Sequence, residues 1–243
     1  MKMLAFAKRN TLEILRDPLT LCFGLGFPIV LLLLLSAIQA NIPVSLFEIA
    51  HLSPGIVAFG LSFMTLFSST LIAKDRTSSL LQRLYTTPLK PIDFMLGYTL
   101  PIIPFSVAQS IVCYIVAFFL GLEITPNVLL AILFVIPIAI FYIALGLLFG
   151  SVLNEKQVGG ISGAMLTNVA AFFSGTWFDL ELVGGVFKDI AYLLPFVHAV
   201  DLERAVLSGN FADIWSHLIW VLGYAIVLLV LAVFLFLRQM KRQ

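Results

Sequence analysis

Residues that could carry out chemistry are few in this chain, and they form no recognisable catalytic pattern. Its three histidines, His51, His198 and His217, are far apart, and we expect them near the outer surface as interfacial side chains rather than as metal ligands or bases. Cys22 and Cys113 both fall within apolar runs, which disfavours a disulfide framework or a metal site and favours buried thiols. The sequence therefore predicts no catalytic residue and no metal site.

Short motifs for nucleotide, zinc and serine chemistry are missing from the sequence. No G-x-x-x-x-G-K-[ST] occurs, so the chain cannot bind ATP through a phosphate-binding loop of that kind. No H-E-x-x-H helix and no G-x-S-x-G turn occurs either. The apolar segments hold no paired acids, no nucleophile with a base and no facing metal ligands, which makes a membrane-embedded enzyme a poor explanation.

The amino-acid composition distinguishes a membrane protein from a soluble one. Apolar residues make up 61% of its 243 residues and charged residues 11%, and the mean hydropathy is +1.09. An average soluble domain has about 45–50% apolar and about 25% charged residues. No soluble fold of this size hides so much apolar surface, so we expect an all-α membrane protein.

The apolar residues form long runs rather than a period-2 alternation, which favours helices over a barrel. A spanning helix needs about 20 apolar residues. Six segments qualify and carry no Lys, Arg, Asp or Glu in their cores: 19–38, 52–73, 95–121, 127–153, 157–178 and 214–237. The first is too long for the apolar part of a cleavable signal peptide, which has about 7–15 residues, so we predict that it is retained as a span.

Basic residues are distributed unevenly between the two sides of these six spans. Twelve of the 14 fall on one side: Lys2, Lys8, Arg9, Arg16, Lys74, Arg76, Arg83, Lys90, Lys156, Arg238, Lys241 and Arg242. Only Lys188 and Arg204 fall on the other, together with eight of the 13 acids, Glu203 among them. Because short cytoplasmic loops carry an excess of Lys and Arg, both termini and the 73–91 segment are predicted to be cytoplasmic.

Three segments remain outside the predicted spans. Residues 1–18 mix apolar and basic side chains, as expected for an amphipathic helix lying in the membrane interface. In 179–210, "GVFKDIAYLL" is too short to cross and Pro195 interrupts the chain, which favours a pair of short re-entrant helices on the outer side. A seventh span is the alternative here, but it would move the basic C-terminus outside, against the charge distribution. The third segment is 73–91.

Polar side chains in the cores of the spans, away from their ends, are limited to hydroxyls and two amides, Gln109 and Asn168. Ion-coupled carriers usually need a buried ionisable residue, so this pattern disfavours a secondary carrier. It does not disfavour a transporter that is powered from outside the chain, in which the two amides are possible polar residues of a translocation path. Gly146 with Gly150 and Gly159 with Gly163 are small-residue pairs that allow close helix contact, either within the chain or in a dimer.

The 73–91 segment, "AKDRTSSLLQRLYTTPLKP", has the pattern of a short amphipathic helix. Its leucines make one face with Tyr85 at the edge, Arg83 projects elsewhere, and Thr87-Pro88 stops the helix. Such a helix could lie on the lipid surface, act as a plain connector, or dock its apolar face into a groove on a soluble partner. A chain without its own energy source would need the last of these.

Two stretches resemble the type-2 ABC transporter permeases. "KDRTSSLLQRLYTTPLKPIDFMLGY" is similar to the family's charged pair, Leu-rich helix and Thr/Ser-Pro-Leu ending. "FSGTWFDLE...LLPFVHAVDLERAVLSG" is similar to a second pattern, in which Pro195 and Arg204 hold the matching positions. Thr77-Ser78-Ser79 replaces the usual Gly-Thr, and Asp179 replaces a favoured Pro. A salt bridge to Asp201 or Glu203 is the alternative role for Arg204.

This resemblance implies that residues 1–243 form one transmembrane permease domain of an ABC exporter in a cell membrane, the inner or plasma membrane. It further implies a second permease chain, identical or different, two separate ATPase subunits that hold the ATP and Mg²⁺, and no cofactor or nucleic acid on this chain. The 73–91 segment would be the coupling helix in the ATPase groove. Its expected contact residues are Asp75, Arg76, Leu80, Leu81, Arg83, Leu84, Tyr85 and Pro88.

The uncharged spans and very short outer loops favour an amphipathic or lipid-like substrate, a drug or a peptide, moved out of the cytoplasm. Export of a polysaccharide or glycolipid is the nearest alternative, and it would predict an aromatic-lined channel. An ATPase-independent channel or secondary carrier is the alternative from a different class. Transport without any ATPase would separate that class from the other two.

Overall fold

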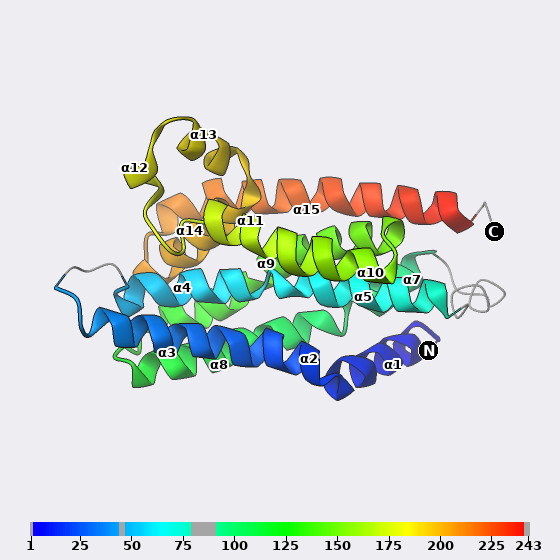
Figure 1. The fold of residues 1–243 in the computed structure, drawn as a ribbon, viewed down its shortest axis with the longest axis horizontal. Coiled ribbons are helices and arrows are strands. Elements are labelled where there is room, and N and C mark those ends of the chain that lie inside the picture. The colour runs from blue at the N-terminus through cyan, green and yellow to red at the C-terminus, as the bar shows by residue number, and fades with distance from the viewer. Residues whose placement is uncertain (1, 44–46, 79–90, 241–243) are drawn as a thin grey trace.

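A computed structural model describes residues 2–43, 47–78 and 91–240, and every regular element in these ranges is a helix (Figure 1). The first half contains α1 (Lys2–Arg16), α2 (Pro18–Leu21), η1 (Cys22–Gly26), α3 (Phe27–Gln39), α4 (Ile49–Gly60), α5 (Phe63–Thr77), α7 (Pro91–Thr99) and α8 (Ile102–Phe119). The second half contains α9 (Asn127–Val152), α10 (Glu155–Val158), η2 (Gly159–Met165), α11 (Leu166–Phe173), α12 (Leu180–Val183), α13 (Gly185–Leu193), α14 (Pro195–Ser208) and α15 (Phe211–Met240). The prediction of an all-α protein is confirmed for these residues.

Five helical runs among the described residues are long and apolar enough to cross a membrane. They are Pro18–Gln39, Ile49–Thr77, Ile92–Phe119, Asn127–Val152 and Phe211–Arg238, and each overlaps a predicted span. The remaining predicted span, 157–178, is helical from Glu155 to Phe173 as α10, η2 and α11, but it is not among the five. Its polar start and Asn168 make it less apolar than the others.

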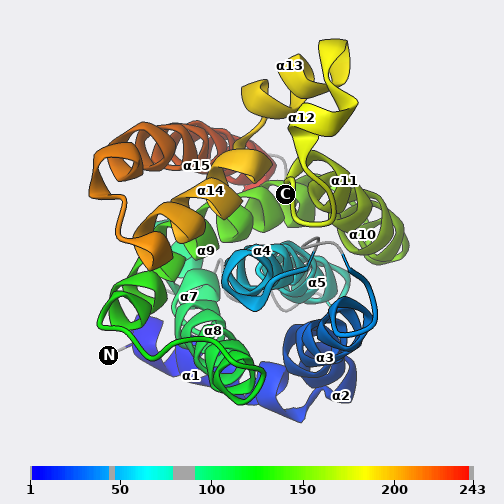
Figure 2. The same cartoon turned by 90° about the vertical axis from the view of Figure 1, so that its left-hand side faces the viewer.

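The long helices surround α4 and α5, which lie at the centre of the end-on view in Figure 2. The α4–α5 run is also the most buried of the five candidate spans. Helix α9 packs against α5, α8, α14 and α15. Gly146 and Gly150 bring α9 close to α5, since a Cβ would meet Thr65 O at 2.7 Å from Gly146 and Ser69 O at 2.9 Å from Gly150. This glycine pair therefore serves packing within the chain.

The two described ends of the chain lie at the same end of the bundle (Figure 1). The end of α5, the start of α7 and the start of α10 lie there too. The described basic residues of α1, α5, α10 and α15 are therefore at one end of the bundle. The opposite end holds the end of α3, the start of α4 and the connection 120–126, together with α12 and α13. That the basic end faces the cytoplasm stays a prediction from the charge distribution.

The 179–210 segment folds into three short helices, α12, α13 and α14, where a pair was predicted, and their re-entrant placement in the membrane stays a prediction. Helix α13 ends at Leu193, and Pro195 begins α14 at its first position, where a missing N–H costs nothing. Gly209 ends α14 in the left-handed conformation with φ of 77°. Helix α14 packs against α4, α9 and α15, whereas α12 and α13 project from the bundle (Figure 2).

Candidate functional site

An apolar cavity of about 600 Å³ lies between the first and second candidate spans and the η2–α11 helix. Six of its lining side chains are aromatic, and two are polar. The lining residues are Phe23, Phe27, Leu31, Phe59, Phe63, Leu66, Gly159, Gly163, Ala164, Thr167, Asn168, Ala171, Phe172 and Trp177. The phenylalanines that are dispersed along the sequence are thus partly gathered around one space.

Aromatic contacts hold the wall of this cavity in place. The rings of Phe27 and Phe63 meet edge to face at 5.7 Å, and those of Phe59 and Phe63 at 5.9 Å. Trp177, just beyond α11, meets Phe59 edge to face at 5.3 Å. Edge-to-face pairs are favourable beyond the area that they bury, so α3, α4 and the end of α11 form one connected wall.

The two amides singled out in the sequence lie in different places. Asn168 lines the cavity, where its Nδ2 donates to Ala164 O at 2.7 Å and its Oδ1 has no partner among the described residues. Gln109 is fully buried between α8 and α4 and donates to Val57 O at 3.3 Å. Its side chain also fills the space beside Gly60. Asn168 is therefore placed to meet a bound molecule, whereas Gln109 holds two helices together.

A buried carboxylate joins three helices at the basic end. Asp75, at the end of α5, is 1% exposed and accepts from Arg9 Nη1 at 2.6 Å and from the Tyr98 hydroxyl at 2.9 Å. Asn10, also buried, donates to Gly97 O at 2.9 Å. Burial lowers the pKa of Arg9, but its bond to Asp75 and the Asp75 charge outweigh this and raise it above its ordinary value. Helix α1 is thus anchored to α5 and α7.

Arg76 also makes its contacts within the chain. It donates to Gly150 O at 2.8 Å and to Leu153 O at 3.2 Å, which are carbonyls at the C-terminal end of α9. A cation is favourable there because unpaired carbonyls give a helix C-terminus partial negative charge. The other expected ATPase-contact residues lie outside the described residues: Leu80, Leu81, Arg83, Leu84, Tyr85 and Pro88.

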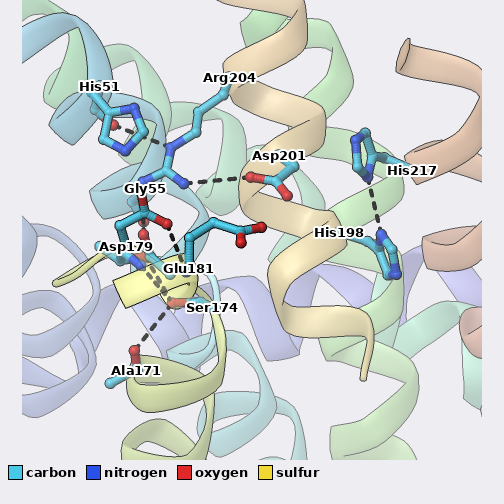
Figure 3. Close-up of polar contacts among 12 residues, drawn as sticks. His51, Gly55, Ala171, Ser174, Asp179, Glu181, His198, Asp201, Arg204 and His217 are labelled. Atoms are coloured by element: carbon cyan, nitrogen blue, oxygen red, sulfur yellow. Dashed lines mark hydrogen bonds and ion pairs between the residues drawn. The ribbon is translucent and has the colours of Figure 1, made fainter. Parts of the chain in front are cut away.

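At the opposite end, Arg204 of α14 links three parts of the chain (Figure 3). It donates to Gly175 O at 2.8 Å and to His51 O at 3.4 Å, and it pairs with Asp201 at 3.4 Å. Burial lowers its pKa from the ordinary value, and the Asp201 charge opposes that change. The salt bridge to Asp201 thus exists, but the backbone contacts tie α14 to α4 and to the end of α11. The bridge to Glu203 is not among the contacts of Arg204.

Glu203, which the sequence suggested as a salt-bridge partner of Arg204, points into the bundle instead. It is fully buried, and the Tyr114 hydroxyl of α8 donates to its Oε2 at 2.8 Å, while Oε1 has no partner in the described residues. Burial raises its pKa to about 8, and the bond from Tyr114 opposes this. A helical pattern could have revealed it, since Phe196, Ala199 and Val200 precede it at the spacing of one buried face.

The prediction that the three histidines are far apart is wrong for two of them. His198 of α14 and His217 of α15 face each other with their Nδ1 atoms 3.0 Å apart (Figure 3). Nothing in the local sequence signals this pair, because it arises from the packing of α14 against α15. His51 lies elsewhere, beside Arg204.

Comparisons with known proteins agree with this arrangement. A family model described as ABC-2 type transporter matches residues 1–208. The protein named ABC transporter G family member 20 from Dictyostelium discoideum is 25% identical over 197 residues, which is 76% of this chain. The chain spans 26% of that relative's length.

Proposed function

Since the chain belongs to the ABC-2 type transporter family, we propose that it is the membrane-spanning permease subunit of an ATP-driven exporter. The family is a transport permease family and not a catalytic one, and the chain is a multi-pass membrane protein. The observation that carries the proposal is the cavity of about 600 Å³ with six aromatic side chains, set among helices that span from one end of the bundle to the other. Such a space suits a bound apolar molecule.

The energy source is proposed to be a separate ATPase, in two copies, that holds the ATP and Mg²⁺. The sequence has no phosphate-binding loop of the G-x-x-x-x-G-K-[ST] kind, so this chain needs a partner for that chemistry. The coupling helix, residues 73–91, is the proposed docking element. The start of this segment, residues 73–77, is the last turn of α5, and it is tied to the bundle because Asp75 is bonded to α1 and α7 and Arg76 to the end of α9. A push on the segment would therefore reach three helices at once.

These ties refine the expected contact set. The charged groups of Asp75 and Arg76 have partners inside the chain. We propose that they fix the base of the coupling helix, and that the leucine face of Leu80, Leu81 and Leu84 meets the ATPase. Arg83, Tyr85 and Pro88 stay predicted contacts of that face.

The proposed substrate is an amphipathic or lipid-like small molecule, a drug or a peptide. Around the cavity only Thr167 and Asn168 offer polar side chains, and the Thr167 hydroxyl already bonds to backbone carbonyls, among them Ala164 O at 3.2 Å. The aromatic walls are what a polysaccharide exporter would also need. However, sugar hydroxyls need many hydrogen-bond partners when they leave water, and this lining supplies few. An apolar substrate therefore fits better than a polysaccharide.

The complex is proposed to contain two permease chains, identical or different, in a cell membrane. Each would be one permease domain over residues 1–243, with six spans, both termini in the cytoplasm and the 179–210 helices re-entrant on the outer side. Helix η2–α11, which lines the cavity, would be the fifth crossing in chain order and would complete the six. A Cβ added at Gly159, at the start of this helix, would meet no described atom within 4 Å, so the helix is open towards the cavity that Gly159 lines.

Reconstitution in liposomes tests the proposal. The chain should transport an amphipathic dye only when a partner ATPase, sought first among proteins encoded beside it, and ATP are both present. Leu81→Asp and Leu84→Asp should abolish co-purification of the ATPase and leave membrane insertion intact, because a charge would enter the apolar docking face. Phe234→Ala, in an exposed position on α15, is the control and should keep the partner.

Two results would count against parts of this proposal. Transport without any ATPase or ATP would identify a channel or secondary carrier instead. Stimulation of ATP hydrolysis by a glycolipid or an oligosaccharide, and not by amphipathic compounds, would favour the polysaccharide alternative.

A further inference from the structure

Two imidazole rings from different helices face each other at the end of the bundle opposite the termini (Figure 3). His198 lies in the first turn of α14 and His217 in the second turn of α15. The chain reverses direction at Gly209, so these turns lie side by side and the two Nδ1 atoms are 3.0 Å apart. The pair belongs neither to the aromatic cavity nor to the coupling helix.

The contacts of His198 determine which of its nitrogens has a free lone pair. Its Nε2 is 3.0 Å from Tyr192 O, and since a carbonyl only accepts, Nε2 must carry the proton. In the neutral ring Nδ1 then has no proton and points at His217. Burial lowers the pKa of His198, which favours this neutral form. Trp220 stacks on the ring at 4.8 Å with an angle of 11° and holds its plane.

A ligand histidine in a metal site has the same arrangement, with one nitrogen bonded to a backbone carbonyl and the other directed at the metal. An N–H···N hydrogen bond from His217 would also account for the 3.0 Å separation. Two Zn–N bonds of about 2.0–2.1 Å at a tetrahedral angle place their nitrogens roughly 3.3 Å apart. To admit the ion, the rings need to separate by a few tenths of an ångström and to tilt so that both Nδ1 lone pairs point at it, while His217 moves its proton to Nε2.

A cation can reach His217 through a cavity of about 760 Å³ that this residue lines. The lining includes four carboxylates and one cationic side chain: Glu48, Glu123, Asp201, Asp213 and Arg204. Negative charge in a cleft raises the local concentration of cations. Asp213 lies one helical turn before His217, on the same face of α15, where it can hold a metal-bound water.

We propose that His198 and His217 form a binding site for a divalent transition-metal cation, Zn²⁺ in the first place, which ties α14 to α15. Imidazole ligands select zinc, copper and nickel over magnesium and calcium, which prefer oxygen. No group of three or more His, Cys, Asp or Glu side chains suitable for a metal occurs in the described ranges, so water fills the other positions. The site is therefore reversible and weaker than a structural zinc site.

Zinc titration of the purified full chain tests the proposal, with an affinity tag that contains no histidine. Calorimetry should show saturable binding of one Zn²⁺ per chain, and the melting temperature should rise with zinc. His198→Gln and His217→Gln should each weaken the apparent affinity by at least about tenfold. His51→Gln is the matched control and should bind as the wild type does, because Arg204 uses the backbone carbonyl of His51 and not its ring.

A second measurement needs no variant, in case one fails to fold. Copper(II) bound to the wild-type chain should give an electron paramagnetic resonance spectrum with two equatorial nitrogen ligands. The proposal is overturned if wild-type chain shows no saturable zinc binding up to millimolar concentration, or if folded His198→Gln and His217→Gln bind zinc as tightly as wild type. The pair would then be an imidazole hydrogen bond alone. Neither experiment requires the ATPase or a transported substrate, so the result is independent of the proposed function.

Discussion

Helix α14 carries three charged residues within one turn, and their side chains point to different surroundings: Asp201, Glu203 and Arg204. Asp201 lines the acidic cavity at the end of the bundle opposite the termini, and Arg204 reaches backbone carbonyls of other segments. Glu203 points the opposite way, into the bundle, where Tyr114 is its partner. A carboxyl group with one unpaired oxygen in a buried place favours its neutral form, because burial penalises the charge.

The buried Glu203 carboxyl should make stability depend on pH. Its pKa is raised from the ordinary 4.5 to about 8, so between these values the folded chain holds a proton that the unfolded chain has released. Stability from this group is therefore complete below about pH 4.5 and declines as the pH rises to about 8. Glu203→Gln keeps an acceptor for Tyr114 and removes the titration, so its melting temperature should exceed that of wild type increasingly from pH 5 to pH 8.

Thermal unfolding of the purified chain at several pH values in this window measures the effect. Glu181→Gln is the control, since Glu181 is exposed and pairs with Lys188 at the surface, and its curve should follow wild type. Parallel curves for wild type and Glu203→Gln would contradict the prediction.

The sequence analysis identified a site residue correctly where the residue itself, or its neighbours in the chain, revealed its role. Asn168 was identified as a polar residue in an apolar helix, and the structure places it in the cavity wall. The burial of Glu203 was missed, because the sequence analysis considered it only as a salt-bridge partner of Arg204 and did not use the helical spacing of its apolar neighbours. The facing of His198 and His217 depends on how two helices pack, which no local pattern contains.

The sequence predicted that α1 is a helix, but it did not predict where this helix packs on the bundle. The mixed apolar and basic pattern of residues 1–18 correctly predicted a helix. Its docking on α7 depends on Phe6, which packs on the Tyr98 ring at 5.0 Å, and on Asn10, which bonds to Gly97 O. The absence of a side chain at Gly97 makes room for Phe6. Whether the outer face of α1 lies in the membrane interface stays a prediction.

Removing the Asp75 charge should loosen α1 from the bundle. Asp75→Asn retains an oxygen for Tyr98 but loses the ion pair with Arg9, which lies at 2.6 Å. Hydrogen bonds to charged groups contribute about 1.5–3 kcal/mol, so a loss of that order is expected. Hydrogen–deuterium exchange should rise in α1 and at the end of α5 and stay unchanged in α13.

Glu13→Gln gives the matched control, because Glu13 pairs with the same Arg9 in a more exposed position. A surface pair contributes about 0–1 kcal/mol, so this variant should exchange nearly as wild type does. Equal exchange of α1 in wild type and Asp75→Asn would show that apolar packing alone anchors the helix.

At the scale of the whole molecule, the sequence pattern accounts for the helical architecture and for the gathering of basic segments at one end. Long apolar runs made the five candidate spans predictable. The η2–α11 helix is the uncertain crossing, because it is shorter and more polar than the others. It contributes Thr167 and Asn168 to the cavity, and a polar helix is tolerated where it lines a cavity instead of facing lipid. Because this helix lines the cavity, it is more polar than the other spans, and a measure of apolar composition therefore does not identify it as a span.

The sidedness of the chain can be measured with single cysteines placed at both ends, after Cys22 and Cys113 are replaced by serine. Lys156→Cys and Arg238→Cys lie at the basic end, and Glu181→Cys lies at the other, all in exposed positions. With basic loops in the cytoplasm, an impermeant thiol reagent added to intact cells should label only Glu181→Cys. The other two should react after permeabilisation. Labelling of Lys156→Cys and Glu181→Cys from the same side would mean that η2–α11 does not cross, and labelling of Arg238→Cys from outside would favour a seventh span.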